Sequence, residues 1–116
     1  IDEAADTLAR EYDTVLIEGA GGLMVPLIED YLTIDYIRDR NLPAVLVTNG
    51  ALGSISHTLL ALEAIRSAGI ELRAVIYNSY FDKDKIIAED TRKYIRHWLE
   101  KRFESTEFME METLKL

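Results

Sequence analysis

Short apolar runs alternate with helical stretches along this chain, and that alternation restricts its possible folds more than any other feature. The runs 14–17, 44–48 and 72–77 are rich in β-branched residues and almost continuously apolar. Such runs are typical of strands in a parallel sheet that is covered on both faces. A fourth run, 106–111, alternates apolar with polar residues, and we expect it at a sheet edge. The pattern predicts an α/β fold with a mostly parallel sheet flanked by helices.

Helical patterns separate and flank these runs. Residues 1–11 have the pattern of a helix already under way, and the clearest helix spans 54–68. Ser54 or Ser56 is expected to cap the first turn of that helix. A last long helix is predicted over 84–103. Its expected apolar stripe consists of Ile87, Thr91, Tyr94, Ile95, Trp98 and Leu99.

Composition and charge exclude several classes of protein. The chain has 116 residues, a net charge of -8 and no cysteine. Its length is below the roughly 150 residues of an average domain, so 1–116 is interpreted as part of a single domain. No apolar run approaches the roughly 18 residues of a membrane span. Scattered basic residues on an acidic chain disfavour nucleic-acid binding. We expect a cytoplasmic protein, and the start at Ile1 within a helical pattern indicates a segment of something longer rather than a targeting signal.

Polar and glycine-rich segments follow the predicted strands. Glu18 to Gly22 follows the first strand, Asn49 to Ser54 the second, and Asn78-Ser79 the third. Right-handed crossovers place the carboxyl ends of parallel strands along one edge of the sheet, where ligands bind. The sequence therefore predicts that these three segments converge on one binding site.

Glu18 is a candidate ligand for a divalent cation. A carboxylate directly after a buried strand needs a partner to offset its desolvation. Magnesium prefers one or two carboxylates together with waters and substrate phosphates, so a single acid suits it. The small residues 19–22 would let backbone N–H groups approach an anion. The alternative is that Glu18 only ends a strand beside a glycine turn.

Two further segments can be interpreted either as binding sites or as ordinary structural features. The helix start 52–56 offers backbone N–H groups and two hydroxyls to a carboxylate or phosphate, although simple capping explains the same residues. Asn78 offers the donor and acceptor that reading a nucleobase edge requires, although Asn also forms turns. His57 is expected at the surface, and no residue is predicted to act as a catalytic acid, base or nucleophile. The motif G-x-x-x-x-G-K-[ST] does not occur in the chain, so we do not expect it to catalyse ATP chemistry alone.

Three ordered motifs resemble the dethiobiotin synthetase family. The run 12–27 resembles that family's V-E-G-A-G-G-x-x-V-P-L segment. The stretches 41–47 and 52–60 resemble its L-P-V-I-L-V and L-G-x-I-N-H-x-L-L segments. The resemblance extends from residue 12 to residue 78 and corresponds to the C-terminal half of the enzyme. It implies part of a P-loop NTPase-like domain of the deviant Walker A (SIMIBI) type, whose phosphate loop lies in the other half.

The resemblance implies an ATP-dependent ring closure in biotin synthesis. In the family, 7,8-diaminononanoate takes up carbon dioxide as a carbamate, the carbamate attacks the γ-phosphate, and the second amine displaces phosphate to close a ureido ring. Glu18 would match the magnesium ligand, and Asn78 the residue that reads adenine. The nucleotide-binding residues so implied are Glu18, Gly19, Ala20, Gly21, Asn78 and Ser79.

The resemblance also implies a homodimer. In it, one helix start would hold the carboxylate tail of the substrate bound mainly to the other subunit. The residues concerned are Leu52, Gly53, Ser54, Ile55 and Ser56. The chain departs from the family at Ser56, where Asn is frequent, and at Ser79, where an acid is frequent. The segment 109–112 stands where the family has a G-E-I-P turn, and it lacks the proline.

Two other interpretations stay open. A related deviant P-loop ATPase is disfavoured by Glu18, where partition ATPases have Asp, and by the lack of the cysteine that amide synthases use. A non-catalytic module that dimerises or binds nucleotide is the second alternative.

Overall fold

The chain divides into two compact units. In a computed structural model, which describes residues 1–113, the first unit ends at Thr33 and the second begins at Ile34. The last three residues of the predicted domain 1–116 lie outside the described part. No helix within residues 1–113 combines the length and the apolar character needed to cross a bilayer.

The first unit contains one helix and a small hairpin. Helix α1 spans Asp2–Glu11, so the predicted helix at the start of the chain is confirmed. Strands β1 (Pro26–Ile28) and β2 (Tyr31–Leu32) pair antiparallel. Asp30, in the turn between them, has a φ of 60°, which is the left-handed region that Asp tolerates better than most residues.

The predicted strand 14–17 does not form. This segment has no regular secondary structure, and Leu16 and Ile17 are 90% and 48% exposed. A strand is held by hydrogen bonds to a neighbouring strand, and none of the described strands pairs with this segment. The prediction was therefore wrong here, because apolar β-branched residues alone do not supply a pairing partner.

The second unit holds the parallel sheet. Its elements in chain order are α2 (Thr33–Asp39, which starts on the last residue of the first unit), β3 (Ala44–Asn49), α3 (Ser54–Ser67), β4 (Leu72–Asn78), the 3-10 helix η1 (Ser79–Phe81), α4 (Lys85–Arg102) and β5 (Glu107–Met111). The strands lie in the order β3-β4-β5, and both pairings are parallel. These observations confirm the parallel α/β fold and the edge position of the fourth predicted strand.

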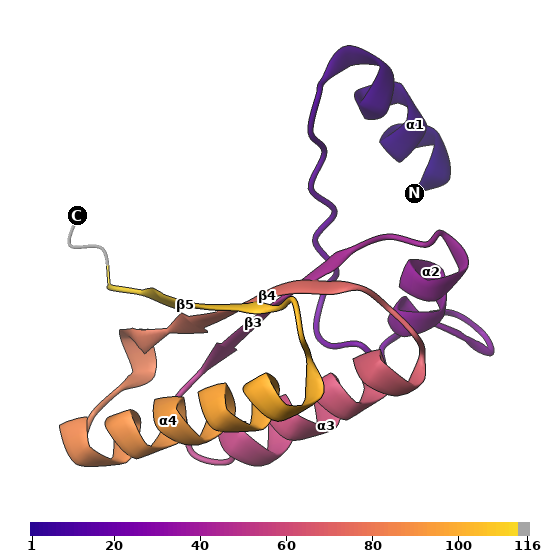
Figure 1. The fold of residues 1–116 in the computed structure, drawn as a ribbon. Helices are drawn as coiled ribbons and strands as arrows, with labels where there is room; N and C mark the ends of the chain where they lie inside the picture. The colour runs from indigo at the N-terminus through magenta and orange to yellow at the C-terminus, as the bar shows by residue number, and fades with distance from the viewer. Residues whose placement is uncertain (114–116) are drawn as a thin grey trace. The chain divides into compact units, whose positions relative to one another are not determined.

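Helices α3 and α4 lie together against one face of this sheet (Figure 1). The core there contains Leu62 and Ile65 of α3, Ile95 and Leu99 of α4, and Val75 and Tyr77 of β4, all at most 2% exposed. The expected coverage of both sheet faces is not found for β3, because Val45 and Val47 on its other side are 51% and 60% exposed.

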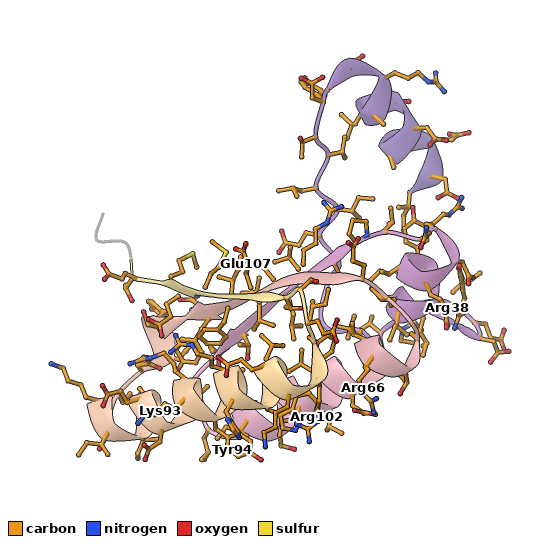
Figure 2. The ribbon with its side chains drawn as sticks, viewed as in Figure 1. Arg38, Arg66, Lys93, Tyr94, Arg102 and Glu107 are labelled. Atoms are coloured by element: carbon orange, nitrogen blue, oxygen red, sulfur yellow. The ribbon has the colours of Figure 1, made fainter. Side chains whose placement is uncertain are left out.

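The apolar stripe of α4 is rotated from the predicted one. The buried residues are Ala88, Thr91, Ile95 and Leu99. Ile87 and Tyr94 are instead 63% and 49% exposed, and Figure 2 shows Tyr94 on the side of α4 away from the sheet. Successive helix residues are about 100° apart. The prediction weighted large apolar residues, whereas the small Ala88 completes the buried face at spacings of three and four.

Candidate functional site

Three strands of the second unit end at the same edge of the sheet. Asn49 of β3 lies opposite Asn78 of β4, and Asn78 lies opposite Met111 of β5. We call the edge formed by these three residues the carboxyl edge. The segments 50–56, 79–82 and 112–113 therefore leave the sheet side by side. The predicted convergence is found for the segments after β3 and β4.

The loop from β3 to α3 has a defined backbone. The side-chain oxygen of Asn49 accepts a hydrogen bond from the N–H of Ala51 (2.9 Å), and the Ala51 carbonyl accepts one from the N–H of Ser54 (2.9 Å). Gly53 has a φ of +86°. That conformation costs a residue with a Cβ about 1–2 kcal/mol, so glycine is favoured at this position.

The start of α3 carries no side-chain cap, contrary to the prediction that Ser54 or Ser56 supplies one. Gly53 occupies the N-cap position and has no side chain to accept a hydrogen bond. Ser54 is already the first helical residue, where a hydroxyl is past the capping position. The first-turn N–H groups of Ile55 and Ser56 consequently lack a capping oxygen. An uncapped N-terminus, with its positive partial charge, favours an anionic group.

Leu52 stands at the tip of the loop before α3. It is fully exposed, and Ile55 is 37% exposed on the first turn. An apolar pair beside uncapped N–H groups matches an aliphatic chain that ends in a carboxylate.

Asn78 has half of its side-chain amide engaged. Its oxygen accepts a hydrogen bond from the N–H of Tyr80 (3.0 Å), which fixes the start of η1. The amide nitrogen keeps two hydrogens to donate to a ligand. Next to it, the Ser79 hydroxyl donates to the carbonyl of Met111 (2.9 Å) and ties the end of β4 to β5.

A shallow pocket of about 170 Å³ opens beside Asn78. Its lining residues are Asn78, Tyr80, Met111, Glu112 and Thr113. Ligand pockets commonly measure about 300–1,000 Å³, so this one is too small for a whole nucleotide and has room only for a smaller group. The segment 109–112 forms the end of β5 and the residue after it, and two of its residues, Met111 and Glu112, line the pocket.

The glycine segment of the first unit is tightly folded. Gly21 has a φ of +80°, and a Cβ on it would lie 2.9 Å from Cγ2 of Val25. The carbonyl of Val25 accepts hydrogen bonds from the N–H of Thr33 (2.9 Å) and from its hydroxyl (3.1 Å). A Cβ on Gly19 would lie 3.4 Å from Cγ2 of Thr33. Glycine is therefore favoured at position 21 by local packing and backbone conformation, whereas a Cβ on Gly19 would make an ordinary van der Waals contact.

Glu18 is exposed, and the predicted reason for its role is wrong. The apolar segment before it is not a buried strand, so burial does not force its carboxylate to take a partner. Its donor set still suits magnesium, because a single accessible carboxylate leaves positions for waters and phosphate oxygens. No cluster of three or more His, Asp or Glu side chains that could enclose a metal occurs within residues 1–113.

Sequence reasoning missed a group of residues beneath the carboxyl edge. Tyr77 is completely buried, and its hydroxyl donates to Oδ1 of Asp82 (2.6 Å). Asp82 also receives a hydrogen bond from Arg92 of α4 (2.8 Å). Burial first, and the hydrogen bond to Asp82 second, raise the pKa of Tyr77 to about 12, so that it remains a donor. Nothing in the sequence marks these residues, because they come from a strand, a loop and a helix.

The chain matches one family model and several curated proteins. The family model described as "AAA domain", a P-loop NTPase-like family, matches residues 1–105. A Haemophilus ducreyi protein named ATP-dependent dethiobiotin synthetase BioD 2 is 46% identical over 112 residues, covering 97% of this chain and 53% of that protein. The Pasteurella multocida protein of the same name is 42% identical over 116 residues, covering 100% and 54%.

A third relative matches a shorter part of this chain. The Chlorobaculum tepidum ATP-dependent dethiobiotin synthetase BioD is 52% identical over 88 residues, covering 76% of this chain and 37% of that protein. The predicted resemblance to dethiobiotin synthetases is thus confirmed. The chain spans about half the length of the first two relatives.

Proposed function

This chain belongs to the AAA domain family, and on that premise we propose that it is the C-terminal portion of an ATP-dependent dethiobiotin synthetase domain. The proposal rests on similarity to the curated enzymes over nearly the whole chain. The observation in the structure that supports it best is the adjacency of Asn49 and Asn78 in the sheet. It brings an uncapped helix start and the small pocket beside Asn78 to the same edge of one unit.

The proposed reaction has three steps. One amine of 7,8-diaminononanoate adds to carbon dioxide and, after losing a proton, becomes a carbamate. A carbamate oxygen then attacks the γ-phosphorus of ATP, and ADP leaves. Finally the second amine attacks the carbamate carbon and expels phosphate, which closes the ureido ring. In the first step the new N–C bond replaces one C=O π bond and a proton is lost, and in the other two steps ADP and then phosphate leave, so the sequence needs no oxidant or reductant.

The residues of the second unit would bind the ends of the substrates. Asn78 would donate its amide hydrogens to the base, with Ser79 holding β4 to β5 beside it. Leu52 and Ile55 would contact the aliphatic chain of the diamine substrate. The carboxylate of that substrate would accept hydrogen bonds from the first-turn backbone N–H groups and from the hydroxyls of Ser54 and Ser56. Gly53 permits the turn that presents them. In a homodimer this substrate would be bound mainly by the other subunit.

Glu18 and the glycine segment would bind the phosphate groups of ATP and their magnesium ion. Glu18 would hold Mg²⁺, and Gly19, Ala20 and Gly21 would lie along the phosphate oxygens. Bound magnesium would neutralise charge that develops on the phosphates during transfer. The chain itself would contribute a single carboxylate and small residues that leave backbone N–H groups accessible to phosphate oxygens.

The test uses the complete polypeptide that contains this sequence. We expect phosphate release that requires ATP, magnesium, bicarbonate and diaminononanoate together, with dethiobiotin identified by its mass. Glu18→Gln should lower kcat/KM by at least about 100-fold, because electrostatic stabilisation of transferred phosphate is a large part of such catalysis. Glu29→Gln is the matched control, since Glu29 is also an exposed acid of the first unit.

The alternative functions give different results. ATP hydrolysis without the diamine would indicate a related P-loop ATPase. No binding of magnesium-ATP would indicate a non-catalytic module. Activity that is the same in Glu18→Gln and wild type would refute the role of Glu18.

A further inference from the structure

A chain of polar contacts runs beneath the carboxyl edge of the sheet, on the face covered by the helices. It starts at the hydroxyl of Tyr77, which donates to Oδ1 of Asp82 (2.6 Å). Arg92 binds the other oxygen of Asp82 through Nη1 (2.8 Å) and reaches Oε1 of Glu110 through Nε (3.3 Å). We call Tyr77, Asp82, Arg92 and Glu110 the support network. It links β4, the segment after η1, α4 and β5.

The end of β3 rests on the same network. A Cβ added at Gly50 would overlap the hydroxyl of Tyr77 and the carboxylate of Asp82, so the Gly50 backbone lies directly against that pair. Gly50 follows Asn49 and begins the loop to α3. The Tyr77–Asp82 pair therefore lies against the first residue of the loop that leads to the uncapped helix start.

Three members of the network, Tyr77, Asp82 and Glu110, lie within or next to segments of the candidate site. Tyr77 precedes Asn78, and the N–H of Asp82 donates to the carbonyl of Ser79 (3.0 Å) and closes η1. Glu110 precedes Met111, whose carbonyl receives the hydroxyl of Ser79. The network thus borders the residues that line the pocket beside Asn78, and none of its own residues lines that pocket.

The Asp82–Arg92 pair of the network is better buried than an ordinary surface ion pair, whereas the Glu110 side chain is 48% exposed. The side chains of Asp82 and Arg92 are 15% and 23% exposed, and the Arg92 guanidinium also lies over the Tyr77 ring at 5.4 Å. By contrast, the pair of Arg66 with Glu63 on α3 is 53% and 46% exposed. Partly buried pairs are screened less by solvent, and removal of one partner leaves the other poorly satisfied.

We propose that Tyr77, Asp82 and Arg92 are positioning residues that hold the helix-start loop and the Asn78 turn at a fixed separation. The proposal rests on the proposed function, since these two segments are the ones assigned to the diamine carboxylate and the base. Loosening the network moves both segments at once. It therefore weakens the binding of both substrates, although none of the three side chains touches either one.

The first experiment measures steady-state kinetics of Asp82→Asn in the complete polypeptide. We expect the KM values for ATP and for diaminononanoate to rise together by about 10- to 100-fold, the range seen when supporting partners of binding groups are removed. The value of kcat should fall less. Arg66→Met is the matched control, because it removes an exposed ion pair of α3 and should leave both KM values unchanged.

A pair of variants at Arg92 tests rescue. Arg92→Met removes the charge and should reproduce the rise in both KM values. Arg92→Lys keeps the charge but has one ammonium in place of the fork that reaches Asp82 and Glu110, so it should recover part of the loss. If both KM values stay at the wild-type level in Asp82→Asn and in Arg92→Met, the proposal is overturned.

A second measurement does not depend on activity. Amide hydrogen exchange in Asp82→Asn should become faster at residues 50–54 and 79–82 and stay unchanged in α1, whereas Arg66→Met should alter neither segment. If Asp82→Asn does not fold, Tyr77→Phe decides, because it removes one hydroxyl and keeps the ring. Two results together would support the network and reject the proposed function: faster exchange in the variant, and no formation of dethiobiotin by the wild-type protein. Unchanged exchange at both segments would reject the network.

Discussion

Single residues at the ends of the strands determine how the candidate site is presented. Gly53 adopts a φ of +86° and so turns the chain into α3 without a capping side chain. Gly50 makes room for the hydroxyl of Tyr77. In both cases the missing side chain has a structural consequence: one glycine leaves helix amides available, and the other allows a buried hydrogen bond directly beneath the loop.

Tyr77 leads to a prediction about alkaline pH. The unfolded chain loses this phenolic proton near the ordinary pKa of 10.0, whereas burial and Asp82 raise the pKa in the folded protein to about 12. The folded state therefore binds more protons between these values, and the free energy of unfolding falls as pH rises from 10 to 12. The stabilisation is fully present below pH 10. We expect a loss on the order of 2 kcal/mol by pH 12.

Urea unfolding of wild type and Tyr77→Phe at several pH values measures this loss. The two proteins differ only at position 77, so the difference between their profiles isolates Tyr77. The variant should start less stable below pH 10 and lose less stability above it. Parallel pH profiles would contradict the expected link between Tyr77 and Asp82.

At the scale of elements, α4 is held by an N-terminal cap and by a narrow buried face that packs on the sheet. The carboxylate of Asp84 accepts hydrogen bonds from the N–H groups of Ile86 (2.9 Å) and Ile87 (3.2 Å). The buried face then follows at Ala88, Thr91, Ile95 and Leu99. The cap sets where the helix starts, and the spacing of these four residues puts them on one face toward the sheet.

Replacing the cap of α4 should be costly. Asp84→Ala leaves two N–H groups unsatisfied, and we expect the free energy of unfolding to drop by about 1 kcal/mol. Lys93→Ala serves as the control, because Lys93 is an exposed residue of the same helix (Figure 2) and should change stability little. Thermal unfolding followed by circular dichroism compares the two. A drop of equal size in both variants would contradict the capping role.

Local pattern predicted most elements of the sheet unit and less of the site. The runs 44–48, 72–77 and 106–111 all became strands, because each has a parallel partner beside it. The same kind of run at 14–17 did not, since pairing depends on residues distant in sequence. The cap of α3 was predicted wrongly for a related reason: a positive φ at Gly53 moved the helix boundary. The support network was invisible because its members lie far apart in the chain.

At the scale of the whole molecule, the two faces of the sheet differ. The face toward α3 and α4 is tightly covered, as at Val75, which is 0% exposed. The other face presents Val45, Val47 and Met109 at 51%, 60% and 48% exposure. Figure 2 shows Glu107 of β5 on that side, away from the helices. Apolar residues on both sides of a strand are typical of sheets covered on both faces.

This exposed face leads to a prediction for the 116-residue polypeptide prepared alone. Contiguous apolar patches of more than a few hundred Å² are rare on soluble monomers and bind apolar probes. We therefore expect the isolated polypeptide to enhance the fluorescence of the dye 8-anilinonaphthalene-1-sulfonate (ANS).

Val45→Thr with Val47→Thr should weaken that enhancement and cost little stability, since threonine favours strands and the sites are half exposed. Val75→Thr, the buried control, should instead destabilise the sheet by about 1–3 kcal/mol, because it buries a hydroxyl. Dye fluorescence that is equal in the double variant and in wild type would show that the probe binds elsewhere and that this face is not the accessible apolar surface.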